Sequence, residues 1–187
     1  MVQTPAKLIT LDKFLQQPET KPPSEYTDHK IVRKPMPQGE HSTLQGDLVT
    51  SINNLVKPNR IARAYPELRC TFGGRSIVPD IAVFLWDRIP RKADGTVANQ
   101  FAIAPDWTIE ILSPNQSQTQ VTAKILHCLE HGTQLGWLID PSERAIFAHA
   151  PQQPLKLFQA TETLLPVPDF AANLHLTVGE IFGWLLE

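Results

Sequence analysis

The chain has 187 residues, 42% of them hydrophobic and 19% charged, and a formal net charge of −2 at pH 7. This length suffices for one domain with a sizeable core, and the composition excludes a disordered protein. The weakly acidic balance argues against a protein that coats nucleic acid non-specifically, because such proteins carry a basic stripe or a basic overall charge. An enzyme acting on nucleic acid is not excluded, since bound metal offsets the charge of its own carboxylates.

The sequence also argues against membrane insertion and export. No apolar run approaches the roughly 20 residues that cross a membrane, and residues 1–7 lack the apolar core of a secretion signal. Cys70 and Cys128 do not have the spacing of a metal site, so we expect both to be reduced thiols. These features together predict a cytoplasmic protein without a membrane segment.

The N-terminal part holds short elements between breakers. Residues 1–9 are expected to form a loose arm, and Thr10 is expected to cap a short helix. The prolines of residues 17–24 predict a loop. Residues 30–33 predict a short strand.

The first strong periodic pattern predicts an amphipathic helix over residues 41–56, which Pro58 ends. Its apolar side chains recur at helical spacing: Leu44, Leu48, Ile52 and Leu55. Three strands are predicted after the helix, at residues 68–72, 77–86 and 107–112. Residues 88–99 contain turn-forming residues and predict a surface loop between the last two strands.

The remaining elements are predicted in the order helix, strand, antiparallel strand pair and helix. They lie at residues 116–131, 135–139, 145–148 with 155–158, and 178–186. A capping box at Thr177 opens the last helix. This order predicts one domain over residues 1–187, of the α/β (α+β) class, with a mixed central sheet flanked by helices.

Three charged residues occupy positions where a folded core prefers apolar ones. Asp80 starts one predicted strand, Glu110 interrupts the apolar run of the next, and Lys124 lies on the apolar stripe of the following helix. Acids and lysines are almost never fully buried unless they are paired or bound to a metal. Taken singly, each has an ordinary explanation: a turn for Asp80, an edge position or a basic partner for Glu110, and a solvent-reaching side chain for Lys124.

Taken together, these residues are the parts of a metal-dependent phosphodiesterase site. Acids at the ends of paired strands can chelate one divalent cation, and Mg²⁺ prefers oxygen ligands. A nearby lysine can orient or help to deprotonate the attacking water, and it can stabilise negative charge in the transition state. Asp106 is excluded as a partner for Glu110, because four residues of an extended strand span about 13 Å. Asp80 is on another strand and can lie beside Glu110.

The order Pro79-Asp80, residues 110–114 and Lys124 resembles the PD-(D/E)XK nuclease superfamily. Within it, the chain is similar to the family of putative restriction endonucleases that was formerly called a domain of unknown function. The resemblance covers most of the chain, including residues 8–15, 37–41, 132 and 137–141. It implies a restriction-endonuclease-like core with a mixed central sheet.

The resemblance further implies that Asp80 and Glu110 bind Mg²⁺ or Mn²⁺, with the carbonyl of Ile111 as a further ligand. No other cofactor is implied. The superfamily usually places its lysine two residues after the acid, where this chain has Leu112. Relatives in this family carry the lysine on the following helix, which matches Lys124.

Further contacts are expected around this site. Glu40 and His41, at the start of the first long helix, are candidates to join it, although Glu40 can instead simply complement the helix N-terminus. Arg88, Arg91 and Lys92, in the loop between the two catalytic strands, are predicted to contact the phosphate backbone of DNA. The resemblance also implies a homodimer, in which two sites can face two strands.

Three functions are therefore considered. The favoured one is a metal-dependent endonuclease acting on DNA. The second is a non-catalytic nucleic-acid-binding or assembly module that keeps the nuclease fold, because Gln120 and Cys128 stand where relatives often have an acid and an aromatic residue. The third is a hydrolase of smaller phosphodiesters. His127 and His131 have a metal-binding spacing but no third ligand evident nearby in sequence, so they are expected to face solvent.

Overall fold

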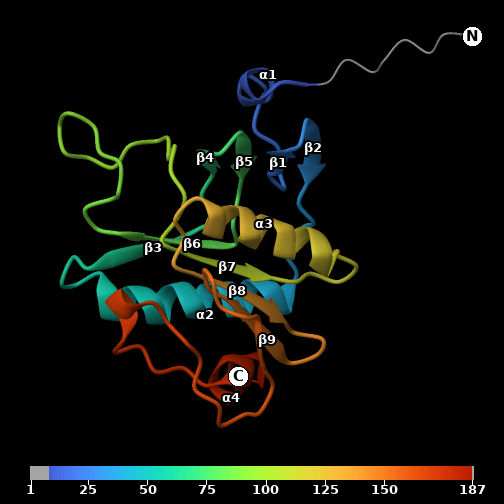
Figure 1. Cartoon of the computed structure of the whole chain (residues 1–187), viewed down its shortest axis with the longest axis vertical. Helices are drawn as coiled ribbons and strands as arrows, with labels where there is room; N and C mark the ends of the chain where they lie inside the picture. Colours follow the sequence, from blue (N-terminus) through green and yellow to red (C-terminus); the bar gives the residue numbers. More distant parts are fainter. Residues whose placement is uncertain (1–8, 187) are drawn as a thin grey trace, which may run out of the picture.

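A six-stranded mixed sheet lies at the centre of the computed structural model, which describes residues 9–186 (Figure 1). Strands β7 and β8 run parallel, and the other neighbours in this sheet run antiparallel. From edge to edge the strands are β10 (Lys156–Phe158), β9 (Ala145–His149), β8 (Leu135–Asp140), β7 (Trp107–Ile111), β6 (Ile81–Leu85) and β3 (Ala62–Pro66). The predicted fold class, a mixed sheet flanked by helices, is confirmed.

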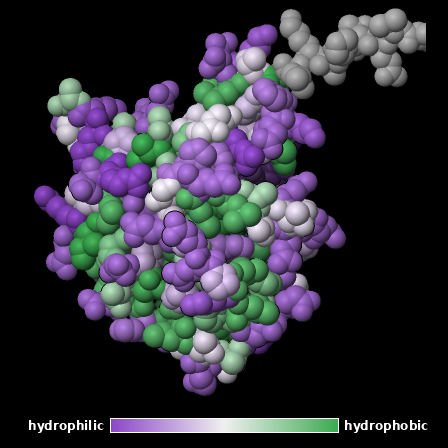
Figure 2. Space-filling model, viewed as in Figure 1, coloured by the Kyte–Doolittle hydropathy of each residue, from purple (hydrophilic) through white to green (hydrophobic). Residues whose placement is uncertain are grey.

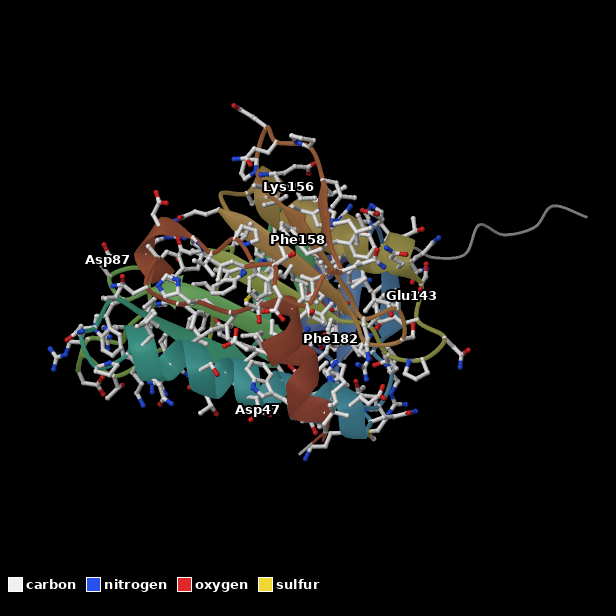
Figure 3. The ribbon with its side chains drawn as sticks, turned by 90° about the horizontal axis from the view of Figure 1, so that it is seen from below. Asp47, Asp87, Glu143, Lys156, Phe158 and Phe182 are labelled. Atoms are coloured by element: carbon white, nitrogen blue, oxygen red, sulfur yellow. The ribbon has the colours of Figure 1, made fainter. Side chains whose placement is uncertain are left out.

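Helices cover both faces of this sheet. α2 (Gly39–Val56) and α4 (Val178–Gly183) pack on one face, and α3 (Gln118–Glu130) packs on the other. Figure 3 views the molecule from the α2 side, where α4, marked by Phe182, lies against α2. The side chains of α2 that are fully buried against the sheet recur every four residues: Leu44, Leu48, Ile52 and Val56. Val56 takes the buried position that was predicted for Leu55, which is only partly buried.

The pairing register brings the two predicted acids to the same level. β6 and β7 pair antiparallel with Ile81 opposite Ile109, so Asp80, one residue before β6, lies next to Glu110. Because successive strand side chains point to opposite faces, Glu110 faces α3 while Ile109 joins the core under α2. The connection from β7 to its parallel neighbour β8 passes through α3, which carries Lys124 over this end of the sheet.

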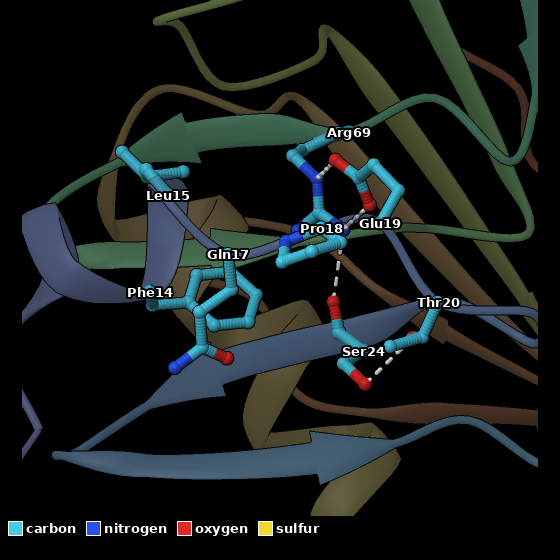
Figure 4. A pocket seen from close by; sticks show the side chains of 8 residues that line it. All are labelled: Phe14, Leu15, Gln17, Pro18, Glu19, Thr20, Ser24 and Arg69. Atoms are coloured by element: carbon cyan, nitrogen blue, oxygen red, sulfur yellow. Dashed lines mark hydrogen bonds and ion pairs between the residues drawn. The ribbon is translucent and has the colours of Figure 1, made fainter.

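A second sheet of four strands was only partly predicted. Its order is β2 (Lys30–Arg33), β1 (Ser24–Thr27), β5 (Arg75–Ile77) and β4 (Cys70–Phe72). β1 begins where the sequence predicted a loop, and it forms because it pairs with both β2 and β5. Arg69 anchors the start of β1, since its guanidinium donates to both carboxylate oxygens of Glu19 and to the carbonyl of Ser24 (Figure 4).

Other boundaries differ from the prediction for local reasons. The strand predicted over residues 77–86 is divided into β5 and β6, because Pro79 lacks the N–H that a ladder requires. β3 was not predicted, and the strand predicted at 68–72 begins only at Cys70.

The ends of the chain agree with the sequence where the structure describes them. The predicted short helix after Thr10 is α1 (Leu11–Leu15), and the antiparallel pair predicted near residues 145 and 155 is β9 with β10. The capping box of Thr177 is present at the start of α4. The predicted arm at residues 1–9 lies, apart from residue 9, outside the described residues. None of the described helices is long and apolar enough to cross a membrane.

Candidate active site

Asp80 is held in place by donors from three different elements. Its side chain is 2% exposed and lies between β5 and β6. Oδ1 accepts a hydrogen bond from Lys34 Nζ at 2.5 Å, and Oδ2 accepts one from the N–H of Ile111 at 2.7 Å. His41 Nε2 lies 3.2 Å from Oδ2. Burial alone would raise the pKa of Asp80, but Lys34 and His41 outweigh it and hold that pKa well below its ordinary value.

Glu110 and Lys124 form a buried ion pair beside Asp80. Glu110 is 1% exposed, and its Oε2 lies 2.7 Å from Lys124 Nζ. Burial raises the pKa of Glu110 to about 8; the ammonium of Lys124 opposes this shift and the nearby charge of Asp80 adds to it. Burial would lower the pKa of Lys124, but Glu110 and the other acids around it raise that pKa above its ordinary value.

Two further charged residues complete the cluster, and sequence reasoning missed both. Glu25 of β1 accepts hydrogen bonds from Lys124 Nζ at 3.0 Å and from the N–H of Val78 at 2.7 Å. Lys34, which follows β2, also donates to the carbonyl of Val78 at 2.8 Å. Glu25 lies just after a predicted loop and Lys34 follows a strand whose side chains are all exposed, so neither had a local signal of burial.

The two candidates at the start of α2 differ in position. His41 is 5% exposed and reaches Asp80, so the structure brings it into the cluster. Glu40 is exposed in the first turn of α2, where its charge complements the partial positive charge of the helix N-terminus. Ile111 contacts Asp80 through its N–H. Its carbonyl as a metal ligand stays a prediction.

The loop carrying Arg88, Arg91 and Lys92 lies at the end of the sheet opposite to Asp80 and Glu110. It joins the end of β6 to the start of β7, about 16 Å from Asp80 if the five residues of β6 rise roughly 3.3 Å each. Figure 3 shows Asp87, in this loop, and Glu143, after the far end of β8, on opposite sides of the molecule. These three residues therefore lie away from a phosphate group held at Asp80 and Glu110, and their contact with the DNA backbone stays a prediction.

The basic residues of this loop have local partners instead. Arg88 pairs with Asp106 at 2.5 Å and donates to the carbonyl of Ala104 at 3.2 Å. The guanidinium of Arg91 lies 5.4 Å from the ring centre of Trp86. Asp106 also accepts from the backbone N–H of Leu85, at the end of β6 away from Asp80.

A groove of about 690 Å³ between the β1–β2 hairpin and α3 reaches the cluster. The β1–β2 hairpin forms one wall, and residues 114–124 of α3 and its preceding loop form the other. Lys34 and Lys124 of the cluster line it, together with Lys30, Arg33 and Arg75; Arg75 is paired with Asp28, which also lines the groove. Basic side chains therefore outnumber acidic ones along the groove that reaches the cluster.

One carboxylate oxygen of the cluster, on Glu110, is suited to bind a divalent cation. Glu110 Oε1 is buried and has no hydrogen-bond partner among the described residues. A buried carboxylate oxygen left without a donor is costly, and a hard cation such as Mg²⁺ takes oxygen ligands of this kind. Asp80 lies beside it at the end of the neighbouring strand. The two acids predicted to bind metal are therefore the ones whose positions suit it.

Two buried acids on paired strands, with a lysine from the following helix, are the arrangement that the resemblance to the restriction-endonuclease-like PD-(D/E)XK nucleases implies. The chain belongs to the Uma2 family, described as "Putative restriction endonuclease", whose family model matches residues 11–179. It is also similar to the crystal structure of a putative nuclease belonging to DUF820 from Anabaena variabilis. That similarity has a TM-score of 0.94 and 62% sequence identity, and covers 95% of this chain and 99% of that chain. No curated protein matches the chain.

Proposed function

We propose that this nuclease is a divalent-metal-dependent endonuclease that hydrolyses phosphodiester bonds in DNA. The observation that carries the proposal is the pair of buried acids, Asp80 and Glu110, beside a lysine that lies 2.7 Å from one of them. Such a pair of acids can hold Mg²⁺ or Mn²⁺. A bound metal of this kind lowers the pKa of its water and neutralises charge on a transferring phosphoryl group.

Each surrounding residue has a role that its contacts support. Lys124 is fixed between Glu110 and Glu25, so its ammonium keeps one position and can stabilise negative charge on a phosphate oxygen. Lys34 and His41 contact the two oxygens of Asp80 and orient its carboxylate. These groups are preorganised by buried contacts, so little reorganisation is needed when a substrate binds.

The groove beside the β1–β2 hairpin is the path that we propose for a DNA strand. Lys30 and Arg33 line it and lead to Lys34 and Lys124. Side chains of this kind neutralise phosphates and supply most of the affinity for nucleic acid. Figure 2 shows many hydrophilic side chains over the upper part of the molecule, with apolar patches among them.

Metal binding is tested by calorimetry with Mn²⁺ and Mg²⁺ on the wild type and on Asp80→Asn and Glu110→Gln. Binding should be lost in both variants, because each removes one carboxylate of the pair. Asp106→Asn is the matched control, since Asp106 is an equally buried acid on the same sheet but at its other end. Binding that survives both site variants would overturn the assignment of the two acids.

The substrate path is tested by charge reversal on the two basic surfaces. Lys30→Glu with Arg33→Glu should weaken DNA binding and reduce cleavage of plasmid DNA in Mg²⁺. Arg91→Glu with Lys92→Glu reverses the same charge in the loop at the far end of β6, and it should leave both nearly unchanged. If the loop variant loses binding and the hairpin variant does not, the DNA contacts the loop of Arg91 and Lys92 instead of the groove. Cleavage of small diesters but not of DNA would favour the smaller substrate.

A non-catalytic module is the second candidate, and one contact favours it. Lys34 already lies 2.5 Å from Asp80, so a lysine ammonium occupies the side of that carboxylate where a metal ion could sit. A protein that binds DNA with unchanged affinity in the presence of a chelator, and that never cleaves it with any divalent cation, would be such a module.

We propose in addition that the protein acts as a homodimer in the cytoplasm. Each chain contributes one site, so two chains are needed to cut both strands at one position. Cys70 and Cys128 are buried free thiols, which suits a reducing compartment. Analytical ultracentrifugation gives the oligomeric state, and a nuclease that remains monomeric on DNA and only nicks it would contradict the dimer.

A further inference from the structure

We propose that His127, Glu130 and His131 form a second metal site, which binds a transition-metal cation such as Zn²⁺ and is independent of the acid pair. The three residues lie at the C-terminal end of α3, one turn apart. Each offers a ligand atom, and these atoms lie within 4.8 Å of one another. The third ligand that the sequence did not reveal is Glu130, three residues after His127, a spacing at which helix side chains are neighbours.

Both imidazoles are already oriented as metal-binding imidazoles usually are. The Nε2 of His127 lies 3.2 Å from the carbonyl oxygen of Phe72, and the Nδ1 of His131 lies 2.8 Å from the carbonyl oxygen of His127. A ring nitrogen that donates to a backbone carbonyl leaves the other ring nitrogen unprotonated in the neutral imidazole. Metal-ligating histidines almost always make such a second contact, because it fixes the tautomer and the ring.

Packing holds His127 in this orientation. The sequence predicted a solvent-facing side chain, but His127 is 5% exposed and stacks on the ring of Phe72, with ring centres 4.9 Å apart. Its ring centre lies 4.4 Å from that of His131, which is exposed. One ligand is therefore rigid and buried, and the other two are open to an ion from solvent.

A glycine in the facing turn packs closely against both imidazoles. Gly73, between β4 and β5, has a φ of +56°, and a Cβ placed on it would lie 2.1 Å from His131 Nε2 and 2.7 Å from His127 Cε1. A larger residue there would have to displace the His131 ring. Gly73 therefore lets the two imidazole rings pack against this turn.

The ligand set selects the class of metal. Two imidazoles and one carboxylate suit Zn²⁺ and related cations, whereas Mg²⁺ takes oxygen ligands and keeps several waters. The end of a helix carries a partial negative charge that favours a bound cation. The site lies beside β4 through the contact of His127 with the carbonyl of Phe72, and His131 is seven residues after Lys124.

Calorimetry of the untagged full chain with Zn²⁺ tests the site, with Co²⁺ absorption as a spectroscopic probe of imidazole ligation. The wild type should bind one Zn²⁺ at this site and unfold at a higher temperature in its presence. His131→Ala should weaken this binding by about tenfold or more and remove the thermal shift, because it deletes one exposed ligand. Glu130→Gln should weaken binding by a smaller factor.

The variant Glu110→Gln separates this site from the acid pair. It should bind Zn²⁺ at the histidines as the wild type does, whether or not the proposed endonuclease activity exists. Three results would overturn the proposal: no Zn²⁺ binding by the wild type, binding of equal strength in His131→Ala, or binding lost in Glu110→Gln. The last result would assign the Zn²⁺ to the acid pair.

Discussion

Replacing Lys124 by methionine should be strongly destabilising, although the two side chains have similar length. Lys124 is 8% exposed, and its Nζ lies 2.7 Å from Glu110 Oε2 and 3.0 Å from Glu25 Oε1. Methionine keeps the apolar stem and removes the charge, so two buried carboxylates lose their shared partner. Removing one member of a buried ion pair costs about 3–5 kcal/mol.

The expected loss lies near the lower end of this range at neutral pH. The pKa of Glu110 is raised to about 8, mainly by burial. The ammonium of Lys124 opposes this shift, so its loss raises that pKa further, and a protonated Glu110 relieves part of the cost. A loss of about 3 kcal/mol in the free energy of unfolding corresponds to a fall of roughly 6–12 °C in Tm for a chain of this size.

Urea unfolding followed by tryptophan fluorescence measures this effect, since Trp107 and Trp137 are fully buried in the core. Lys30→Met is the matched control, because Lys30 is exposed and a surface change of this kind costs within about 0.5 kcal/mol. Adding Glu25→Gln to Lys124→Met should restore part of the stability. A loss below about 1 kcal/mol in Lys124→Met would refute the buried ion pair as a source of stability.

Three other predictions concern the fold. Gly136→Ala should lower the free energy of unfolding by about 1–3 kcal/mol, because the added Cβ would lie 2.3 Å from Ile125 Cγ2. Thermal unfolding measures this loss, and an unchanged stability would mean that Ile125 moves freely. Leu48→Ala should cost about 2–5 kcal/mol, since Leu48 is fully buried under the sheet, and a loss below that range would show that the core collapses around the cavity.

Burial lowers the pKa of His149 below its ordinary value of 6.5, so the unfolded chain binds more protons around that pH. Its contribution to stability is present above about 6.5 and is lost as the pH falls through the folded pKa. His149→Phe should weaken the dependence of the unfolding free energy on pH near 6.5. If the free energies of the two proteins changed with pH in parallel, the assignment to His149 would be contradicted.

Periodic and local signals were enough to predict most of the main sheet and its helices. The apolar spacing of α2 and α3 and the apolar run of β7 are properties of neighbouring residues, so the sequence alone indicates them. The acid pair followed from the same reasoning. A charged residue inside an apolar strand is anomalous wherever that strand is placed, and Asp80 and Glu110 are indeed buried side by side.

The parts that were missed depend on contacts between distant residues. β1 follows two prolines and forms only because β2 and β5 pair with it, and Ser76 of β5 is about 50 residues further along the chain. Glu25 is therefore buried by a strand that local propensity does not predict. Lys34 follows an exposed strand, and its burial depends on Asp80, which is 46 residues away.

The position of Arg88, Arg91 and Lys92 follows from the order of the two acids. Asp80 precedes β6 and Glu110 lies near the end of β7. In an antiparallel pair with the two acids side by side, the connecting loop must lie at the opposite end of both strands. Closeness in sequence to the two strands therefore does not place these residues beside the acids, and their contact with the DNA backbone stays a prediction.

The charges inside the site bear on the proposed divalent cation. Three buried carboxylates, Glu25, Asp80 and Glu110, face two buried ammonium groups, Lys34 and Lys124. If all five groups are ionised, the cluster carries one excess negative charge. Glu110 Oε1 has no donor among the described residues, and burial, together with the nearby charge of Asp80, raises the pKa of Glu110. A proton on Glu110 would neutralise the excess charge without a metal. A divalent cation would instead give the cluster one net positive charge, and a phosphodiester entering the groove would supply the balancing anion.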